Sequence, residues 1–234
     1  MNFTNRSYDR ELLDAPSIPF EDLLINLREL NTINTYLGGH QATLRGIGHF
    51  LSPGTKSGTI SVAEIGCGGG DNLAVIHKYL ERRNQAHRLT GIDIKAECTR
   101  YAAQARPEPA DWICSDYRTV DWASGKPDII FSSLFCHHFT NEELIGQLIW
   151  LRENSRLGFF INDLHRHPLA YYSIGLLTGL FSKSYLVKND APLSVRRGFK
   201  KKEWLSLLTD AGISNAVITW EWAFRHLIVV KNEH

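Results

Sequence analysis

Residues 62–71 read VAEIGCGGGD, an apolar run that carries Glu64 and then breaks into closely spaced glycines. The chain resumes afterwards with the apolar, helix-like segment 72–77. Because glycine has no side chain, it permits a tight turn and lets a ligand contact the backbone. A helix that follows such a loop directs its free N–H groups and the positive end of its dipole toward the loop. The pattern therefore predicts a strand, a loop and a helix start that bind a small polar or anionic cofactor.

Four histidines follow two later apolar runs and are candidates for proton transfer. His137 and His138 come after the run 128–134, and His165 and His167 follow the next run. Imidazole titrates near neutral pH and can accept a proton from a hydroxyl group. A histidine at such a place can equally begin a helix or fill a packing position, so the structural alternative stays open.

The elements that would position these residues alternate regularly from residue 60 onward. Predicted strands cover 61–65, 89–94, 112–114, 128–134 and 157–161, and the pair 217–222 and 226–230 closes the chain. Helical patterns between buried apolar runs predict an α/β fold with a doubly wound, mostly parallel sheet of seven strands. Ligands of such sheets bind beyond the carboxyl ends of the strands. We expect one cleft there, faced by Gly66, Asp93, Asp116, Ser133 and Asn162.

The regions outside this alternation predict a helical cap and an insertion. Apolar residues at helical spacing between residues 20 and 51 predict two helices in an N-terminal cap, residues 1–58, which pack on the core or cover a ligand cleft. The core then spans 59–234. After the fifth strand, residues 165–198 form the predicted insertion, an aromatic and apolar helix followed by a polar loop.

Composition narrows the class of protein. The chain has 234 residues, 43% of them hydrophobic, and a net charge of +1, which is ordinary for a globular protein and disfavours nucleic acid as a partner. The four cysteines show no C-x-x-C spacing, so we expect reduced thiols and no metal site. Neither a signal peptide nor a segment long enough to span a bilayer is recognisable, which predicts a cytoplasmic protein.

Two cofactor classes use a glycine loop of this kind. A dinucleotide fold requires G-x-G-x-x-G and an acidic residue about 20 positions later. The first two glycines and Asp93 fit, but Asp71 occupies the third glycine position. A dinucleotide site also gives no reason for Glu64 inside the strand or for Asp116 after the third strand.

The pattern Glu64-x-Gly66-x-Gly68-x-Gly70 resembles motif I of the class I S-adenosylmethionine (SAM) methyltransferases. The resemblance extends from about residue 60 to the C-terminus and implies the Rossmann-like fold of these enzymes. Residues 128–139, DIIFSSLFCHHF, are similar to the fourth-strand motif of small-molecule methyltransferases. Segments 34–40 and 162–171 resemble bacterial methyltransferases of polyketide and quinone-like metabolites.

The resemblance also implies roles for individual residues. Glu64 and the loop would hold the aminocarboxypropyl end of SAM, Asp93 would accept hydrogen bonds from both ribose hydroxyls, and Asp116 would accept one from the adenine amino group. A carboxylate can accept two hydroxyl donors at once, which suits the ribose role. The cofactor-binding residues implied are Glu64, Gly66, Cys67, Gly68, Gly70, Asp93, Ile94, Ser115, Asp116, Tyr117 and Ser133.

We therefore expect methyl transfer from SAM to a small molecule of secondary metabolism, at the hydroxyl of an aromatic or polyketide-like acceptor, with S-adenosylhomocysteine as product. The protein must align the acceptor, exclude water and remove the hydroxyl proton. The candidate bases are His137, His138 and His165. C-methylation of a quinone-type ring is the nearest alternative. An NAD-dependent oxidoreductase and a non-catalytic SAM-binding scaffold are alternatives of other classes.

Three further features have a structural interpretation, and the first two also have a functional one. The basic cluster Arg196–Lys202 would contact an acidic carrier protein or a membrane surface, or would be a solvated helix start. The residues that would line an apolar acceptor pocket, or form an amphipathic cover helix, are Tyr171, Tyr172, Leu176, Leu177, Leu180 and Phe181. Asp163 and Arg166 would form a local ion pair.

Overall fold

The computed structural model describes residues 2–15, 17–51, 58–106, 110–122 and 125–233. Within them a single sheet has the strand order β3-β2-β1-β4-β5-β7-β6. Its strands are β1 (Ile60–Ile65), β2 (His87–Asp93), β3 (Ala110–Cys114), β4 (Ile129–Ser133), β5 (Gly158–Leu164), β6 (Val217–Glu221) and β7 (Arg225–Lys231). The first five strands pair in parallel, and β7 pairs antiparallel with both β5 and β6. The predicted doubly wound, mostly parallel sheet of seven strands is confirmed.

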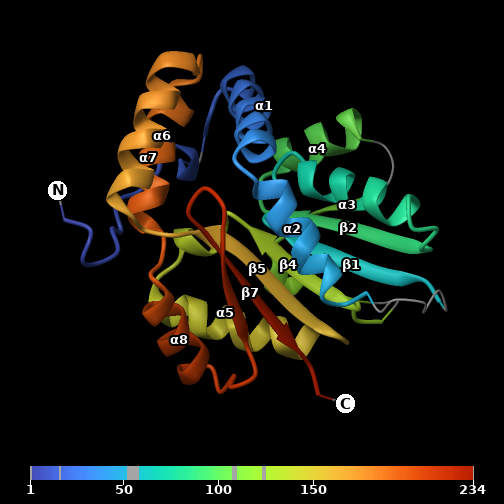
Figure 1. Cartoon of the computed structure of the whole chain (residues 1–234). Coiled ribbons are helices and arrows are strands. Elements are labelled where there is room, and N and C mark those ends of the chain that lie inside the picture. Colours follow the sequence, from blue (N-terminus) through green and yellow to red (C-terminus); the bar gives the residue numbers. More distant parts are fainter. Residues whose placement is uncertain (1, 16, 52–57, 107–109, 123–124, 234) are drawn as a thin grey trace.

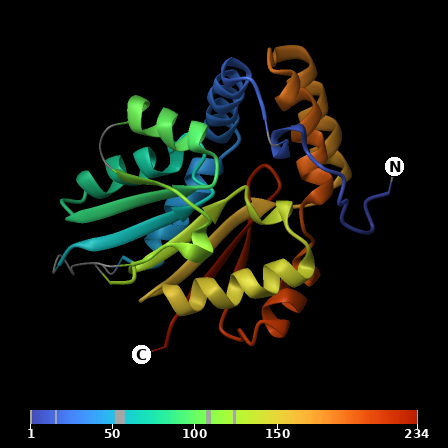
Figure 2. The same ribbon diagram turned by 180° about the vertical axis from the view of Figure 1, so that it is seen from behind.

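The longer helices are α1 (Phe20–Tyr36), α2 (Gly39–Gly48), α3 (Asp71–Glu81), α4 (Ala96–Ala105), α5 (Asn141–Asn154), α6 (Pro168–Phe181), α7 (Tyr185–Arg197) and α8 (Lys201–Asp210). Helices α2 and α3 cover one face of the sheet, and α5 and α8 cover the other (Figure 1). Helices α1, α6 and α7 stand beyond one end of the sheet (Figure 2). None of the helices in the described part of the chain combines the length and apolarity that a membrane crossing requires.

The central strands explain why the core forms where it does. Ile129, Ile130 and Phe131 of β4 are fully buried because helices cover the sheet on both faces. The rings of Phe131 and Phe160 stack with centroids 4.8 Å apart. A Cβ on Gly46 of α2 would lie 2.4 Å from the Phe160 ring, so glycine lets this helix approach the sheet closely. Helix α2 is therefore part of the core packing.

The N-terminal helices thus differ in their contacts. Helix α2 packs on the sheet, whereas Leu23 and Leu27 of α1 pack against Cys98 of α4. The division into a cap of residues 1–58 and a core of 59–234 stays a prediction, and residues 52–57 between them lie outside the described residues.

The predicted polar loop of the insertion is wrong, because these residues form helix α7. Ser184 caps the helix by accepting a hydrogen bond from the Val187 N–H. The buried carboxylate of Asp190 accepts hydrogen bonds from the backbone N–H groups of Leu12 and Leu13. The polar residues of this stretch therefore bind the N-terminal segment, a partner that local sequence does not reveal.

Candidate active site

The loop between β1 and α3 has the backbone that its glycines predict. Gly66, Gly68 and Gly70 all have positive φ, at 67°, 50° and 75°. A Cβ on Gly66 would lie 2.3 Å from the Phe135 ring, and one on Gly70 would lie 2.2 Å from the Trp112 ring. Both the conformation and the packing therefore require glycine at these two positions.

A cavity of about 450 Å³ lies beside this loop and is called the glycine-loop cavity below. Its size falls within the range of small-molecule sites. Seven of the predicted cofactor-binding residues line it: Glu64, Gly66, Cys67, Gly68, Asp93, Ile94 and Ser133. The Asp93 carboxylate accepts hydrogen bonds from the backbone N–H groups of Gly68 and Lys95, each at 2.9 Å. The end of β2 is thus hydrogen-bonded directly to the glycine loop.

Glu64 is the most deeply buried charged group of this cavity, with 1% of its surface exposed. One carboxylate oxygen accepts a hydrogen bond from Asn72 Nδ2 at 2.7 Å, and the other has no partner. Burial raises the pKa of Glu64 well above its usual range, against the opposing effect of the Asn72 hydrogen bond. A buried acceptor without a donor is costly, so a ligand that supplies a cationic donor fits this position.

The other predicted cofactor residues lie outside the cavity lining. Gly70 precedes α3, and Ser115 bonds to Thr119. The Asp116 carboxylate binds the Arg118 guanidinium at 2.5 Å on the surface, and this pairing lowers its pKa. Tyr117 accepts a hydrogen bond from Gln147. Their cofactor roles stay predictions. Asn162, predicted at the same cleft, is fully buried and donates a hydrogen bond to Ser133 Oγ at 3.2 Å.

A second cavity of about 340 Å³ lies between α1, α6, α7 and the β6–β7 turn, and is called the apolar cavity below. Most of its wall is apolar, including Ile33, Leu37, Ile174, Val187, Trp220, Trp222 and Phe224. Of the residues of 171–181 expected at such a pocket, Leu177 lines it, while Tyr172, Leu176, Leu180 and Phe181 are exposed on the outer side of α6. Helix α6 is thus both a pocket wall and a cover helix.

The two cavities share part of their walls. Leu13, Leu30, Leu134 and His138 line both of them. Leu134 directly follows β4 and has a φ of 54°, a left-handed backbone that is costly for leucine. Its N–H donates to the Asn162 carbonyl at 2.9 Å, which holds this conformation. Strain in a non-glycine residue is therefore located at the junction of the cavities.

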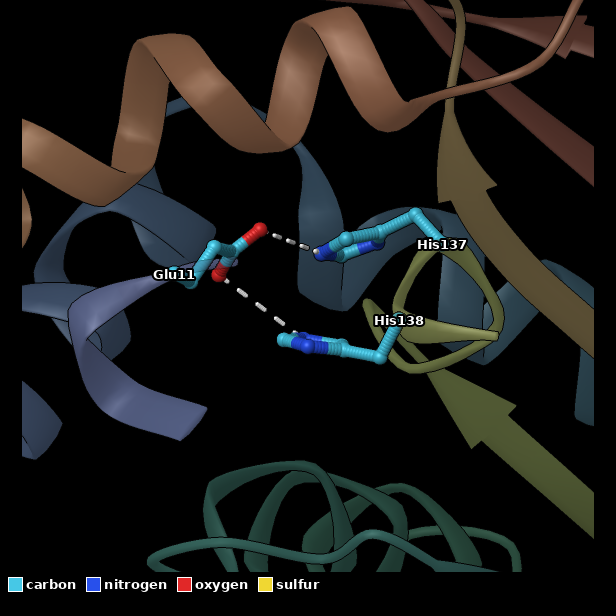
Figure 3. A group of neighbouring side chains, drawn as sticks. All are labelled: Glu11, His137 and His138. Atoms are coloured by element: carbon cyan, nitrogen blue, oxygen red, sulfur yellow. Dashed lines mark ion pairs between the residues drawn. The ribbon is translucent and has the colours of Figure 1, made fainter. Parts of the chain in front are cut away.

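A group of polar side chains lies beside that junction. His137 Nδ1 donates to Asp163 at 2.7 Å, and His138 Nδ1 donates to Asp14 at 2.9 Å. On the other edge of the two rings, the Nε2 atoms face the Glu11 carboxylate at 3.6 and 3.8 Å (Figure 3). Glu11, His137 and His138 all line the apolar cavity.

The acids of this group have displaced pKa values. Burial raises the pKa of Glu11 to about 6, although His138 and a hydrogen bond from Ser194 oppose the rise. Burial also acts on Asp14, but the hydrogen bond and charge of His138 outweigh it and hold the pKa of Asp14 at about 2. The pKa values of Glu11 and Asp14, three residues apart, are thus shifted in opposite directions.

The remaining histidine candidates lie elsewhere. His165 is outside the lining of both cavities, and its ring packs against His226 with centroids 4.7 Å apart. His167 caps α6 by accepting a hydrogen bond from the Leu169 N–H. A catalytic role for His165 stays a prediction.

Two pairings differ from those expected. The predicted ion pair of Asp163 and Arg166 is wrong, because Asp163 binds His137 and Arg166 binds Glu203 at 2.6 Å. In the basic cluster, Arg197 is 4% exposed and donates to the carbonyls of His137 and His138. Arg197 therefore supports the polar group, while contact of a carrier protein or membrane with the rest of Arg196–Lys202 stays a prediction.

Comparison with known proteins relates part of the chain to a family model and its fold to solved structures. Residues 62–151 match the sequence model of a methyltransferase domain. This stretch contains most of β1, the glycine loop, Asp93, β4 and the histidine pair. No curated protein sequence matches the chain.

Several solved structures share the fold at low sequence identity. The plantazolicin methyltransferase BpumL, solved in complex with SAH, is 20% identical, with a TM-score of 0.64 over 91% of this chain and 90% of that one. A putative O-methyltransferase from Nostoc punctiforme is 13% identical, with a TM-score of 0.59 over 88% of this chain and 60% of that one. The CurJ carbon methyltransferase is 21% identical, with a TM-score of 0.56 over 81% and 53%.

The match to a methyltransferase domain and the fold shared with solved methyltransferases are consistent with the sheet order and the glycine loop of this chain. Residues 62–151 match a methyltransferase domain, and the chain has the fold of the class I methyltransferases, enzymes whose methyl donor is SAM.

Proposed function

We propose that the chain transfers the methyl group of SAM to a hydroxyl group of an apolar small molecule, of the aromatic or polyketide-like kind. The observation that carries this proposal is the junction of the two cavities. The glycine-loop cavity has the acids and glycines of a SAM site, the apolar cavity is suited to an acceptor, and both are bounded by Leu134 and His138.

The residues of the glycine-loop cavity fit SAM. The unpaired oxygen of Glu64 would accept a hydrogen bond from the ammonium group at the aminocarboxypropyl end. Asp93 would accept the ribose hydroxyls, and the exposed side chain of Ile94 would pack against the adenine. When bound, SAM supplies a methyl group on a sulfonium that is already activated for displacement.

The apolar cavity indicates the class of acceptor. Its wall is formed by aliphatic side chains from α1, α6 and α7 and by the tryptophans Trp220 and Trp222. Such a wall stabilises a flat or branched apolar molecule by removing its surface from water. It also excludes water, which would otherwise compete with the acceptor for the methyl group of SAM.

The histidine pair is the polar feature that would remove the hydroxyl proton. Because both Nδ1 atoms donate to carboxylates, the Nε2 atoms carry the free lone pairs. His138 is the titratable residue among the four that line both cavities, so its Nε2 is the first candidate for the base. His137, held by Asp163, is the second.

Turnover of isotopically labelled SAM with a panel of apolar phenols tests this function. We expect methylated phenols, and we expect His138→Gln to lower kcat more than it weakens S-adenosylhomocysteine binding. His77→Gln is the matched control, because this histidine lies outside both cavities and is not a candidate base. NAD binding without S-adenosylhomocysteine binding would contradict the proposal in favour of a dehydrogenase. Binding without any turnover would favour a non-catalytic scaffold, and mapping the methyl group in the product distinguishes O- from C-methylation.

A further inference from the structure

Three side chains beside the junction converge on one point from two distant parts of the chain. Glu11 lies in the N-terminal segment, and His137 and His138 lie in the short 3-10 helix Cys136–His138 after β4. One oxygen or nitrogen atom from each lies within 4.8 Å of the others. Their side chains are 3%, 3% and 20% exposed, so the point is nearly closed to bulk solvent.

The hydrogen bonds of the two rings leave this point electron-rich. Each Nδ1 lies at hydrogen-bond distance from a carboxylate, Asp163 or Asp14, so the neutral form of each ring would present its lone pair on Nε2. Both lone pairs face the Glu11 carboxylate, which has only lone pairs to offer in return. The distances of 3.6 and 3.8 Å from Nε2 to oxygen are too long for N–H···O hydrogen bonds. A proton on one of these atoms, or a metal ion between them, would relieve the repulsion between the lone pairs.

The same distances suit a metal ion. Zinc binds histidine nitrogen and carboxylate oxygen at about 2.0–2.2 Å, so two ligands of one ion at the tetrahedral angle lie about 3.3–3.6 Å apart, slightly closer than the 3.6 and 3.8 Å found here. Two histidines and one glutamate are a donor set of catalytic zinc sites, which keep a further position for water or substrate. The carboxylates on both Nδ1 atoms also match the outer hydrogen bonds that orient metal-bound histidines.

Neighbouring charges leave room for a cation. Arg197 Nε lies 3.8 Å from Glu11, and its Nη1 binds Asp14 at 3.2 Å. Arg6 donates to the carbonyls of His137 and Phe139, and the buried Arg225 guanidinium interacts with the charge of Asp163. The carboxylates of Glu11, Asp14, Asp163 and Asp190 outnumber the guanidinium groups of Arg6, Arg197 and Arg225, so the ionised acids leave an excess of negative charge.

We infer that Glu11, His137 and His138 bind a first-row divalent metal ion, such as Zn²⁺, with its open position toward the apolar cavity. The sequence alone predicts no metal site, because Glu11 is far from the histidines in the chain. Binding of the ion does not depend on the proposed function, but its role does. An ion bound there would take the hydroxyl oxygen of the acceptor as a ligand and lower the pKa of that hydroxyl. The Nε2 atoms would then be ligands, and the acceptor would bind as its anion, with the hydroxyl proton released to bulk solvent as it binds.

A second cluster must be removed before this site is tested. His77, Glu81 and His87 also form a group of potential ligands, on the outer part of α3 and the start of β2. There the two rings already bond to each other, with Nδ1 of His77 2.8 Å from Nε2 of His87. A chain with His77→Gln and His87→Gln is therefore the reference protein, since both positions lie outside the two cavities.

The test is titration of the metal-stripped reference protein with Co²⁺, followed by visible absorption, and with Zn²⁺, followed by calorimetry. We expect one ion per chain and d–d bands typical of nitrogen and oxygen ligands. Glu11→Gln and His138→Gln in the same background should each weaken binding by at least about tenfold, and Asp14→Asn by about tenfold. His165→Gln should leave the affinity unchanged.

Thermal unfolding provides a second measurement if a variant folds poorly. Zn²⁺ should raise the Tm of the reference protein but not that of Glu11→Gln. Absence of Co²⁺ binding, or binding that survives both Glu11→Gln and His138→Gln, would overturn the inference. Methyl transfer by a chelator-treated protein that binds no metal would leave the proposed function intact, whereas metal binding without methyl transfer would overturn only that function.

Discussion

Asp163 accepts a hydrogen bond from Nδ1 of His137 at 2.7 Å, across the ends of the neighbouring strands β5 and β4. Burial opposes the ionised form of Asp163, but the imidazole outweighs burial and lowers the pKa of this acid. The contact fixes the ring of His137 so that its Nε2 points to the apolar cavity. It also shows how the parallel register of β4 and β5 assembles one site from two motifs.

Loss of the Asp93 carboxylate should weaken cofactor binding. Asp93→Asn removes a charged acceptor at the end of β2, and we expect S-adenosylhomocysteine to bind more weakly by about 1–3 kcal/mol. Calorimetric titration measures the change.

Asp116→Asn is the matched control for that variant. Its carboxylate binds Arg118 on the surface and lies outside the glycine-loop cavity. We expect a smaller loss of affinity than for Asp93→Asn. Equal losses would mean that Asp116 reaches the cofactor, as the resemblance implies, and an unchanged affinity in Asp93→Asn would remove Asp93 from the site.

Glu64 should make both stability and cofactor affinity depend on pH. Its pKa is raised in the folded state, so its contribution is fully favourable below the unfolded value of 4.5 and is lost as pH rises through the folded value. A cationic ammonium group favours the ionised form, so cofactor binding should release a proton at any pH at which Glu64 is protonated in the free protein. Calorimetry in two buffers of different ionisation enthalpy measures this release, which Glu64→Gln should abolish.

Filling the apolar cavity should weaken binding of the acceptor and leave binding of the cofactor unchanged. Ala191 of α7 lines this cavity and not the glycine-loop cavity. We expect Ala191→Trp to raise the KM for a phenolic acceptor about tenfold or more, with S-adenosylhomocysteine affinity unchanged. Leu180→Ala, on the exposed side of α6, is the control and should change neither value. A loss of cofactor affinity in Ala191→Trp would argue against two separate cavities.

Two glycines should respond to alanine in opposite directions. Gly70→Ala places a Cβ 2.2 Å from Trp112 at a φ of 75°, and the left-handed backbone alone costs about 1–3 kcal/mol. Gly179, within α6, has no atom within 4 Å of an added Cβ, so Gly179→Ala should stabilise the chain by about 0.5–1 kcal/mol. Urea unfolding measures both, and a neutral Gly70→Ala would show that the loop has a different backbone.

His226 should contribute to acid sensitivity. Burial and the neighbouring His165 lower its pKa to about 4 from an unfolded value of 6.5. Its stability contribution is therefore fully present above pH 6.5 and is lost as pH falls toward 4, by about 3 kcal/mol in total. The free energy of unfolding of His226→Asn should fall less over this range. If the free energy of unfolding depends on pH in the same way in the wild-type chain and in His226→Asn, the lowered pKa of His226 is contradicted.

The sheet, the glycine loop and the acids Glu64 and Asp93 were predictable because each depends on local patterns of burial and on strand-end geometry. Glu11 was not, since it acquires its role only when the N-terminal segment folds over the histidine pair. Helix α7 was missed for a related reason, because its polar residues are bound by that same segment. The partners of Asp163 and Arg166 are also set by tertiary contacts, and sequence proximity suggested the wrong pair.

The most direct test of the proposed function is mass-spectrometric detection of methyl transfer from deuterium-labelled SAM to an apolar phenol. We expect a phenol that carries the labelled methyl group on oxygen, formed by the wild-type chain and much more slowly by His138→Gln. No labelled product across a broad panel of phenols, from a chain that binds S-adenosylhomocysteine, would contradict this function.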